Sequence, residues 1–197
     1  MAVTRVVYEA DGWGGGELWF EGSKLVWHEL PRPRLDAAGL ASPRPKGRAK
    51  TPPGPHPGGE TTHRPLTATI PAKGRQMGNG TGPIASQLVH SLQRFFAGER
   101  VGFDEVELDL DAYTPFKLEL ASALRSIPSG EVISYRELAA AAGRPNAQRA
   151  AGTFCAHNRY PLVVPCHRVV AADGIGAYGS LGVEYKRRLL ELEGVAL

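Results

Sequence analysis

Cysteine is scarce in this sequence, since only Cys155 and Cys166 occur among 197 residues. The two are not spaced as a CxxC pair, and the N-terminal half contains no cysteine. A disulfide framework is therefore not expected, and a cysteine-rich zinc site is excluded. Two free thiols suit the reducing cytosol.

Long apolar runs are also missing. No stretch approaches the length that spans a membrane. The opening residues 1–8 have the alternation of a strand rather than the apolar core of a signal peptide. We therefore expect a soluble, cytoplasmic protein with no membrane partner.

A strong excess of one charge is absent from the chain as a whole, whose formal net charge is +3. The excess lies in the middle, because residues 31–82 carry 9 basic and 2 acidic side chains while residues 111–197 carry 10 and 8. If the C-terminal part binds DNA, it should make few phosphate contacts, and its affinity should depend only weakly on salt.

Large apolar side chains are almost absent from residues 31–82, which hold 10 of the 16 prolines and 9 of the 24 glycines. Such a segment cannot bury enough surface to offset its ordering entropy, so we predict that it is a disordered insertion. Its nine basic residues could add loose affinity for DNA, or the segment could serve only to solubilise the chain. The composition leaves both readings open.

The N-terminal part has the pattern of a small antiparallel sheet. Strands are predicted at 3–8, 17–20 and 24–30, separated by glycine-containing turns. An apolar stripe then predicts a helix from Pro83 to Gly98, and the alternating residues 106–110 predict a strand that completes the sheet. The stripe consists of Ile84, Leu88, Leu92, Phe95 and Phe96. Trp19 and Trp27 are expected in the core of this sheet rather than on a base-stacking surface.

The C-terminal part has the pattern of a helix-turn-helix. A first helix is predicted after Thr114, with proline at its first position, and it ends before Gly130. Ser134 and Glu137 form a capping box that opens a short helix. After a turn, Asn146 is expected to cap a second helix that runs to about residue 156. Small residues near the start of that second helix would let its backbone approach a partner, or would pack against the protein itself.

One thiol and one imidazole interrupt the apolar run at residues 163–170. The run predicts a buried strand that breaks at Pro165, which would place Cys166 at a bend inside an apolar wall. On an extended backbone the side chains of Cys166 and His167 would point to opposite faces, so a proton would pass between them through a water. A small buried hydrophobe and a structural histidine are the alternative interpretation.

Residues 165–169, with the sequence PCHRV, resemble the acceptor-cysteine motif of the O6-alkylguanine-DNA alkyltransferases. The resemblance extends almost continuously over residues 111–197 and more weakly over the N-terminal strands. It implies that Cys166 is both the nucleophile and the alkyl acceptor. It also implies that His167 takes the thiol proton and that Glu193 orients His167.

The resemblance assigns further roles in the helix-turn-helix. Tyr135 would crowd the target phosphate and help to rotate the nucleotide, and Arg149 would enter the base stack in its place. Ala150 and Gly152 would lie on the recognition helix, against DNA. Asn158 corresponds to the hinge asparagine that ties this helix to the active site.

The guanine pocket departs from the family pattern in several places. Tyr178 matches the tyrosine that lines the pocket, where Tyr135 and Val169 are also expected, but the loop before Tyr178 is one residue shorter than in many relatives. Gly179 stands where a serine is common, so a contact to O6 of guanine would come from a backbone amide or from Ser180. Some relatives bind zinc in the N-terminal domain, whereas this chain has no cysteine there, so we expect no metal and no cofactor.

Together, the patterns and the resemblance imply an α/β (α+β) protein with two domains. Residues 1–110 would form a ribonuclease H-like domain around an antiparallel sheet, with the insertion at 31–82. Residues 111–197 would form a mostly helical, winged-helix-like domain that carries the helix-turn-helix and the alkyl acceptor.

The expected function is direct-reversal DNA repair. Cys166 would take a methyl or other alkyl group from O6-alkylguanine, or from O4-alkylthymine, in flipped-out double-stranded DNA. The transfer would be irreversible and stoichiometric, carried out by a monomer. The leading alternative is a damage-recognition protein of the same fold without transfer activity. A helix-turn-helix regulator would need a more basic recognition helix, and the adjacency of Cys166 and His167 disfavours a cysteine hydrolase.

Overall fold

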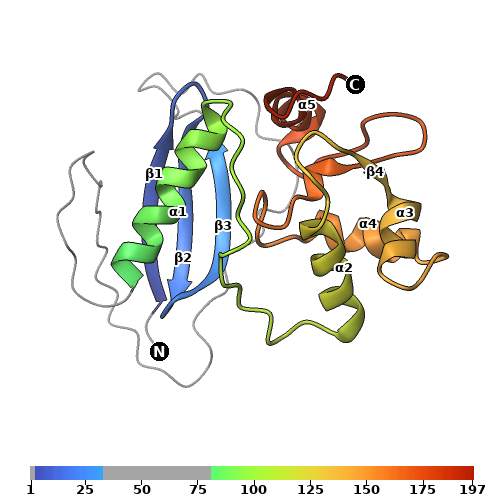
Figure 1. Cartoon of the computed structure of the whole chain (residues 1–197), viewed down its shortest axis with the longest axis horizontal. Helices are drawn as coiled ribbons and strands as arrows, with labels where there is room; N and C mark the ends of the chain where they lie inside the picture. The colour runs from blue at the N-terminus through green and yellow to red at the C-terminus, as the bar shows by residue number, and fades with distance from the viewer. Residues whose placement is uncertain (1–2, 33–80) are drawn as a thin grey trace.

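The computed structural model describes residues 3–32 and 81–197. Its N-terminal part is a three-stranded antiparallel sheet of order β1-β2-β3, covered by helix α1 (Figure 1). The elements are β1 (Val3–Ala10), β2 (Gly14–Glu21), β3 (Lys24–Arg32) and α1 (Thr81–Phe96). The predicted meander is confirmed, and β2 starts three residues earlier than its apolar pattern suggested.

The basic, proline-rich insertion is shorter than predicted at both ends. Pro31 and Arg32 are the last residues of β3, while Thr81 and Gly82 already belong to α1. The rest of the predicted disordered segment, residues 33–80, lies outside the described residues.

The core of the sheet forms between its inner face and α1. The buried face of the helix includes Leu88, Leu92, Phe95 and Phe96 as predicted, but Ile84 is 38% exposed and Ala85 takes the buried position instead. Trp27 is buried, whereas Trp19 is half-buried beneath the guanidinium of Arg5. Val89 also belongs to the buried face of the helix. The buried side chains of the sheet include Val6, Tyr8, Leu18, Phe20 and Leu25.

The predicted strand at 106–110 is wrong. The segment makes one isolated parallel bridge, between Leu25 and Leu108, with Leu25 N donating to Glu107 O at 2.8 Å and Asp109 N donating to Leu25 O at 3.0 Å. A turn precedes it at Phe103–Val106, and another follows it at Leu110–Tyr113. Because these turns bend the chain on both sides, the pairing with β3 stops after one bridge.

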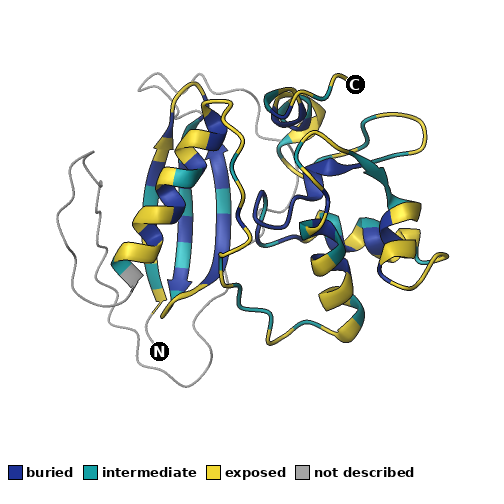
Figure 2. Ribbon diagram, viewed as in Figure 1, coloured by how far each residue is buried: buried dark blue, intermediate teal, exposed yellow. Residues whose placement is uncertain are grey.

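The C-terminal part is mostly helical and lies beside β3 (Figure 1). Its helices are α2 (Pro115–Arg125), α3 (Tyr135–Ala141), α4 (Gln148–Ala156) and α5 (Gly182–Leu192). Between them run a 3-10 turn η1 (Cys166–Arg168) and two short parallel strands, β4 (Ile133–Ser134) and β5 (Val169–Val170). β3 is the most deeply buried strand, because its outer side meets this part (Figure 2).

The predicted helix starts are mostly confirmed. The capping box is present, with Glu137 N donating to Ser134 Oγ at 3.2 Å and Ser134 N donating to the Glu137 carboxylate at 2.6 Å. Thr114 occupies the N-cap of α2 without a side-chain cap bond. The predicted cap at Asn146 is wrong, because α4 starts one residue later, with Ala147 at its N-cap.

No helix in the described ranges combines the length and apolar character needed to cross a membrane.

Candidate active site

Cys166 lies in a tight turn rather than in a strand, so the predicted strand at 163–170 is wrong for most of its length. Pro165 has φ −78° and ψ 66°, the values of an inverse γ-turn, and Cys166 N donates to Val164 O at 2.8 Å. Arg168 N then donates to Pro165 O at 3.0 Å, which closes the 3-10 turn. Proline has no N–H for a ladder, so the backbone curls here, and only Val169–Val170 pair as a strand.

The thiol of Cys166 is buried and hydrogen-bonded. The residue is 6% exposed, and its Sγ accepts a hydrogen bond from Asn158 Nδ2 at 3.2 Å. The same Nδ2 donates to Val164 O at 2.7 Å, and Asn158 Oδ1 accepts from Tyr160 N at 3.0 Å. Asn158 therefore joins the segment after α4 to the cysteine turn, and its N–H points a positive dipole at the sulfur, which favours the thiolate.

His167 and Glu193 are in direct contact, as their expected roles require. His167 Nε2 donates to Glu193 Oε1 at 3.0 Å, and both side chains are buried. Burial lowers the pKa of His167, although the Glu193 carboxylate opposes that shift, so the imidazole is neutral near pH 7. With the proton on Nε2, the other nitrogen Nδ1 is the acceptor; it is buried and bonds to none of the described residues.

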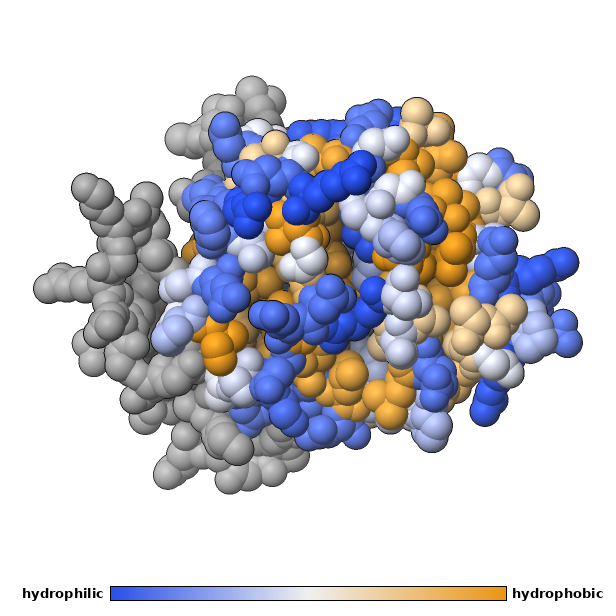
Figure 3. All heavy atoms as spheres, in the orientation of Figure 1, coloured by the Kyte–Doolittle hydropathy of each residue, from blue (hydrophilic) through white to orange (hydrophobic). Residues whose placement is uncertain are grey.

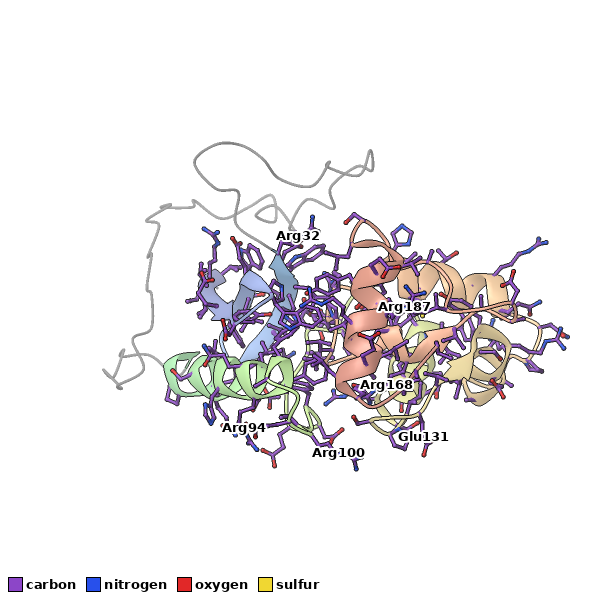
Figure 4. All side chains as sticks on the ribbon, turned by 90° about the horizontal axis from the view of Figure 1, so that it is seen from above. Arg32, Arg94, Arg100, Glu131, Arg168 and Arg187 are labelled. Atoms are coloured by element: carbon purple, nitrogen blue, oxygen red, sulfur yellow. The ribbon has the colours of Figure 1, made fainter. Side chains whose placement is uncertain are left out.

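Arg168 holds Glu193 from the other side, a contact that the sequence analysis missed. Its Nη2 donates to Glu193 Oε1 at 2.7 Å, its Nε donates to Oε2 at 3.0 Å, and its Nη1 donates to Ile127 O at 2.5 Å. Burial opposes ionisation of Glu193, but hydrogen bonds from His167 and Arg168 outweigh it and lower the pKa of Glu193 to about 2. Arg168 lies next to α5 in the view from above (Figure 4).

Lys186 is a second buried cation that the sequence analysis missed. It is 0% exposed, and its Nζ donates to Val169 O at 2.6 Å and to Ile175 O at 2.5 Å. The signal was present in the sequence, because Lys186 precedes the buried Leu189 and Leu190 by three and four residues and so shares their face of α5. Lys186 ties the strand after the cysteine to the loop at residues 171–181.

The predicted pocket residues divide between the interior and the surface. Val169 is 0% exposed, and the Tyr178 hydroxyl is buried beside Cys166. Burial and the neighbouring Cys166 raise the pKa of Tyr178, so the hydroxyl keeps its proton. Gly179 and Ser180 are exposed on the following loop, where Ser180 Oγ accepts from Arg32 Nη2 at 3.3 Å.

The predicted DNA-contacting residues lie on α3 and α4. Arg149 and Ala150 are exposed, while Gly152 faces the ring of Tyr135, which a Cβ at that glycine would meet at 3.9 Å. Burial, and to a lesser extent the charges of the two cysteines, raise the pKa of Tyr135. Hydrophilic side chains form the projecting edge over the α3–α4 turn (Figure 3).

The sequence of this chain is similar to those of known proteins. The family model described as "6-O-methylguanine DNA methyltransferase, DNA binding domain" matches residues 115–195. The methylated-DNA–protein-cysteine methyltransferase of Methanopyrus kandleri is 40% identical over 129 residues, which cover 66% of this chain and 95% of the relative. The chain belongs to the methylated-DNA–protein-cysteine methyltransferase family.

Solved structures of this methyltransferase family share the fold. The O6-methylguanine methyltransferase of Mycobacterium tuberculosis superposes with a TM-score of 0.64 at 31% identity, covering 98% of this chain and 93% of that one. The same organism's protein in complex with DNA gives a TM-score of 0.63 at 32% identity, covering 96% and 91%. The coarse fold prediction, a small antiparallel sheet with helices, is confirmed.

Several of the predicted site residues lie around the sulfur of Cys166. The structure brings Cys166 together with Asn158 and Tyr178, and it joins His167 to Glu193. Within the described ranges, no group of three or more His, Cys, Asp or Glu side chains is placed to hold a metal ion.

Proposed function

We propose that this chain repairs alkylated DNA by moving the alkyl group from O6 of guanine onto Sγ of Cys166. The observation that carries the proposal is the buried thiol, which accepts a hydrogen bond from Asn158 beside a neutral His167 that is oriented by Glu193. This is the nucleophile, base and orienting group that an activated thiol requires.

Proton transfer comes first in the proposed reaction. The Cys166 proton passes through a water to Nδ1 of His167, and Glu193 stabilises the imidazolium that results. Arg168 keeps Glu193 ionised, so the carboxylate stays an acceptor throughout.

Alkyl transfer follows as an in-line displacement. The thiolate attacks the alkyl carbon, the S–C bond forms, and the C–O6 bond breaks with its electron pair going to guanine. The guanine then takes up the proton that left the thiol. The product is a thioether that no neighbouring group can hydrolyse, so each molecule reacts once.

The buried position of Cys166 requires the damaged nucleotide to leave the duplex. We assign the rotation of the target phosphate to Tyr135 and the occupation of the vacated stack to Arg149, which is exposed on α4. Ala150 and Gly152 would let the α4 backbone approach the DNA closely.

The flipped base would be held by Val169, Tyr178 and the loop at Gly179 and Ser180, with Tyr135 at its border. Ser180 Oγ already accepts a bond from Arg32, but its hydroxyl hydrogen can still be donated to O6 of guanine, as can the backbone N–H groups of the loop.

The finer features of the fold and of the setting belong to the same proposal. Residues 1–110 form a ribonuclease H-like domain, and residues 111–197 form a winged-helix-like domain that binds double-stranded DNA with O6-alkylguanine. The protein acts as a monomer without a metal or cofactor. A reaction that needs a free thiol fits the reducing cytoplasm.

Intact mass measurement tests the proposal. After mixing with duplex DNA that contains O6-methylguanine, the protein should gain one methyl group and stop at one equivalent. Cys166→Ser should gain none, and Cys155→Ser, which removes the other thiol, should react like the unaltered chain. An unaltered mass together with tight binding to the damaged duplex would support damage recognition without transfer and overturn the proposal.

A further inference from the structure

A buried histidine in the N-terminal sheet touches the segment that leads to the reactive cysteine. His28 of β3 is 2% exposed, and its Nδ1 lies 2.7 Å from Pro161 O. Its Nε2 lies 2.7 Å from Tyr8 Oη on β1, and its backbone N donates to Arg159 O at 2.9 Å. The two halves of the chain therefore meet through hydrogen bonds just ahead of the active site.

The direction of these bonds follows from the acceptor. Pro161 O can only accept, so Nδ1 of His28 carries the proton and Nε2 accepts from the Tyr8 hydroxyl. Burial lowers the pKa of His28 to about 4, although the bond to Pro161 opposes the shift, and burial raises the pKa of Tyr8. Near pH 7 the imidazole is therefore neutral, and both of its nitrogens are bonded.

The segment held by His28 contains a strained residue. Leu162, directly after Pro161, has φ 70°, and no other non-glycine residue in the described ranges has a positive φ. A branched side chain disfavours this left-handed conformation, so contacts on either side must hold it. One such contact is the His28 bond to Pro161 O, and another is the bond from Val164 N to Tyr160 O at 2.7 Å.

The same turn sets the position of the group that touches the sulfur. Val164 O accepts from Asn158 Nδ2, whose other N–H reaches Cys166 Sγ. A shift of the turn at Leu162 would move Val164 O and rotate the Asn158 amide away from the thiol.

We propose that His28, oriented by Tyr8, is a positioning residue for the alkyl transfer: its bond to Pro161 holds the Leu162 turn so that Asn158 stays against Cys166. This inference rests on the proposed function. A core histidine with a purely structural role is the competing explanation, and it predicts a lower melting temperature without a slower reaction of the folded protein.

A second anchor limits the size of the expected effect. Arg159 Nη2 and the Tyr160 hydroxyl both bond to Asp109 O, so the segment stays tied to the N-terminal part without His28. We therefore expect displacement rather than loss of the turn. A misplacement of about 1 Å at a reacting group can cost roughly 100-fold, so a slowing of roughly 10- to 100-fold is expected.

The test compares substitutions that differ in one hydrogen bond. His28→Leu removes the donor to Pro161, while His28→Asn keeps an amide N–H near the position of Nδ1, and Tyr8→Phe removes the orienting hydroxyl. The rate constant of methyl transfer from an O6-methylguanine duplex at saturating protein and the dissociation constant for undamaged duplex are measured well below the melting temperature. The controls are His90→Leu, an exposed histidine on α1, and Val6→Ala, a sheet-core truncation.

The expected result is a split between rate and affinity. His28→Leu should slow transfer with unchanged DNA affinity, His28→Asn should restore most of the rate, and Tyr8→Phe should lie between them. Val6→Ala should lower the melting temperature at the unaltered rate, and His90→Leu should change neither. Equal rates for His28→Leu and Val6→Ala at matched stability, or no recovery in His28→Asn, would overturn the inference.

A second readout separates this inference from the proposed function. If the unaltered chain transferred no methyl group, the proposed function would fail, yet the alkylation of Cys166 by iodoacetamide could still be followed by peptide mass. His28→Leu should slow that alkylation at Cys166 and leave Cys155 unchanged, because only Cys166 depends on the Asn158 amide. Equal alkylation of Cys166 in both proteins would contradict the positioning role.

Discussion

The two halves of the described chain are stabilised in different ways. In the sheet and α1, the buried residues are apolar with one exception, His28. The C-terminal part has an apolar core too, but it also buries charged and polar side chains around the reactive cysteine: Asn158, His167, Arg168, Lys186 and Glu193. All of these side chains make hydrogen bonds, so the desolvation of each is offset locally.

The difference shows that the C-terminal part gives up stability in order to bury the groups that the reaction needs. An apolar core tolerates small changes by repacking, whereas a network of buried charges fails when one partner is lost. The sheet can therefore act as a rigid support whose packing is replaceable, with His28 as its specific link to the site.

Removal of the central carboxylate should have the largest effect. Glu193→Ala leaves the Arg168 guanidinium buried without its counter-ion and His167 Nε2 without its acceptor. Breaking such a pair costs about 3–5 kcal/mol of unfolding free energy. We also expect transfer to stop, because His167 is no longer oriented.

The matched substitution in the sheet is Leu18→Ala. Leu18 is fully buried, and its truncation costs a similar amount, about 2–5 kcal/mol. Transfer by the molecules that remain folded should nevertheless continue at the unaltered rate. Urea unfolding and mass-detected transfer measure both quantities. A Glu193→Ala protein with unaltered stability would show that the charge network is not needed for folding.

Acidification should destabilise both halves, beginning with their buried histidines, His28 and His167. His28 has a pKa of about 4 in the folded chain against 6.5 for an ordinary histidine, so the unfolded chain binds a proton first as the pH falls. The stability from neutral His28 is complete above pH 6.5 and is lost towards pH 4, a change of about 3 kcal/mol. The pKa of His167 is lowered as well, so its contribution to stability is also lost as the pH falls.

The carboxylate responds at lower pH. The pKa of Glu193 is about 2 when folded against 4.5 otherwise, so its contribution is complete above pH 4.5 and falls as the pH drops towards 2. Urea unfolding at a series of pH values tests the order. His28→Asn should flatten the curve between pH 6.5 and 4, and the exposed control His90→Asn should not. Identical curves for His28→Asn and the unaltered chain would rule out His28 as the sensitive group.

The sequence predicted the parts of this contrast that depend on neighbours along the chain. The capping box at Ser134 and Glu137 is a four-residue pattern, and the meander follows from alternation and glycine turns. The acceptor motif could be identified by resemblance alone, as could the pairing of His167 with Glu193.

Contacts between distant residues were not predictable in the same way. The strand predicted through Cys166 does not form, because Pro165 makes a turn that a run of apolar residues does not reveal. Residues 106–110 alternate between apolar and polar side chains like a strand, but turns on both sides limit their pairing with β3 to one bridge. His28 and Pro161 are separated by 133 residues, and no local pattern marks a β3 histidine as the partner of a carbonyl beside the active site.

The smallest change that we predict tests whether the sheet is only a support. Gly16 on β2 lies opposite Tyr8 on β1, and a Cβ at Gly16 would come within 2.5–2.7 Å of the Tyr8 ring and hydroxyl. Gly16→Ala should therefore displace that hydroxyl from His28 and cost about 1–3 kcal/mol through overpacking.

Transfer should also slow in Gly16→Ala, although the substituted residue is on the central strand of the sheet and not on β3, which meets the C-terminal part. Gly22→Ala is the matched control, since its added Cβ would meet nothing within 4 Å, and any cost there comes from its φ of 61°. It should therefore lower stability without slowing transfer. In the double variant Gly16→Ala/Tyr8→Phe, the alanine should add little to the slowing caused by Tyr8→Phe, because both act through the same hydroxyl. Additive slowing would mean that Gly16→Ala acts on Cys166 by a route other than the Tyr8 hydroxyl.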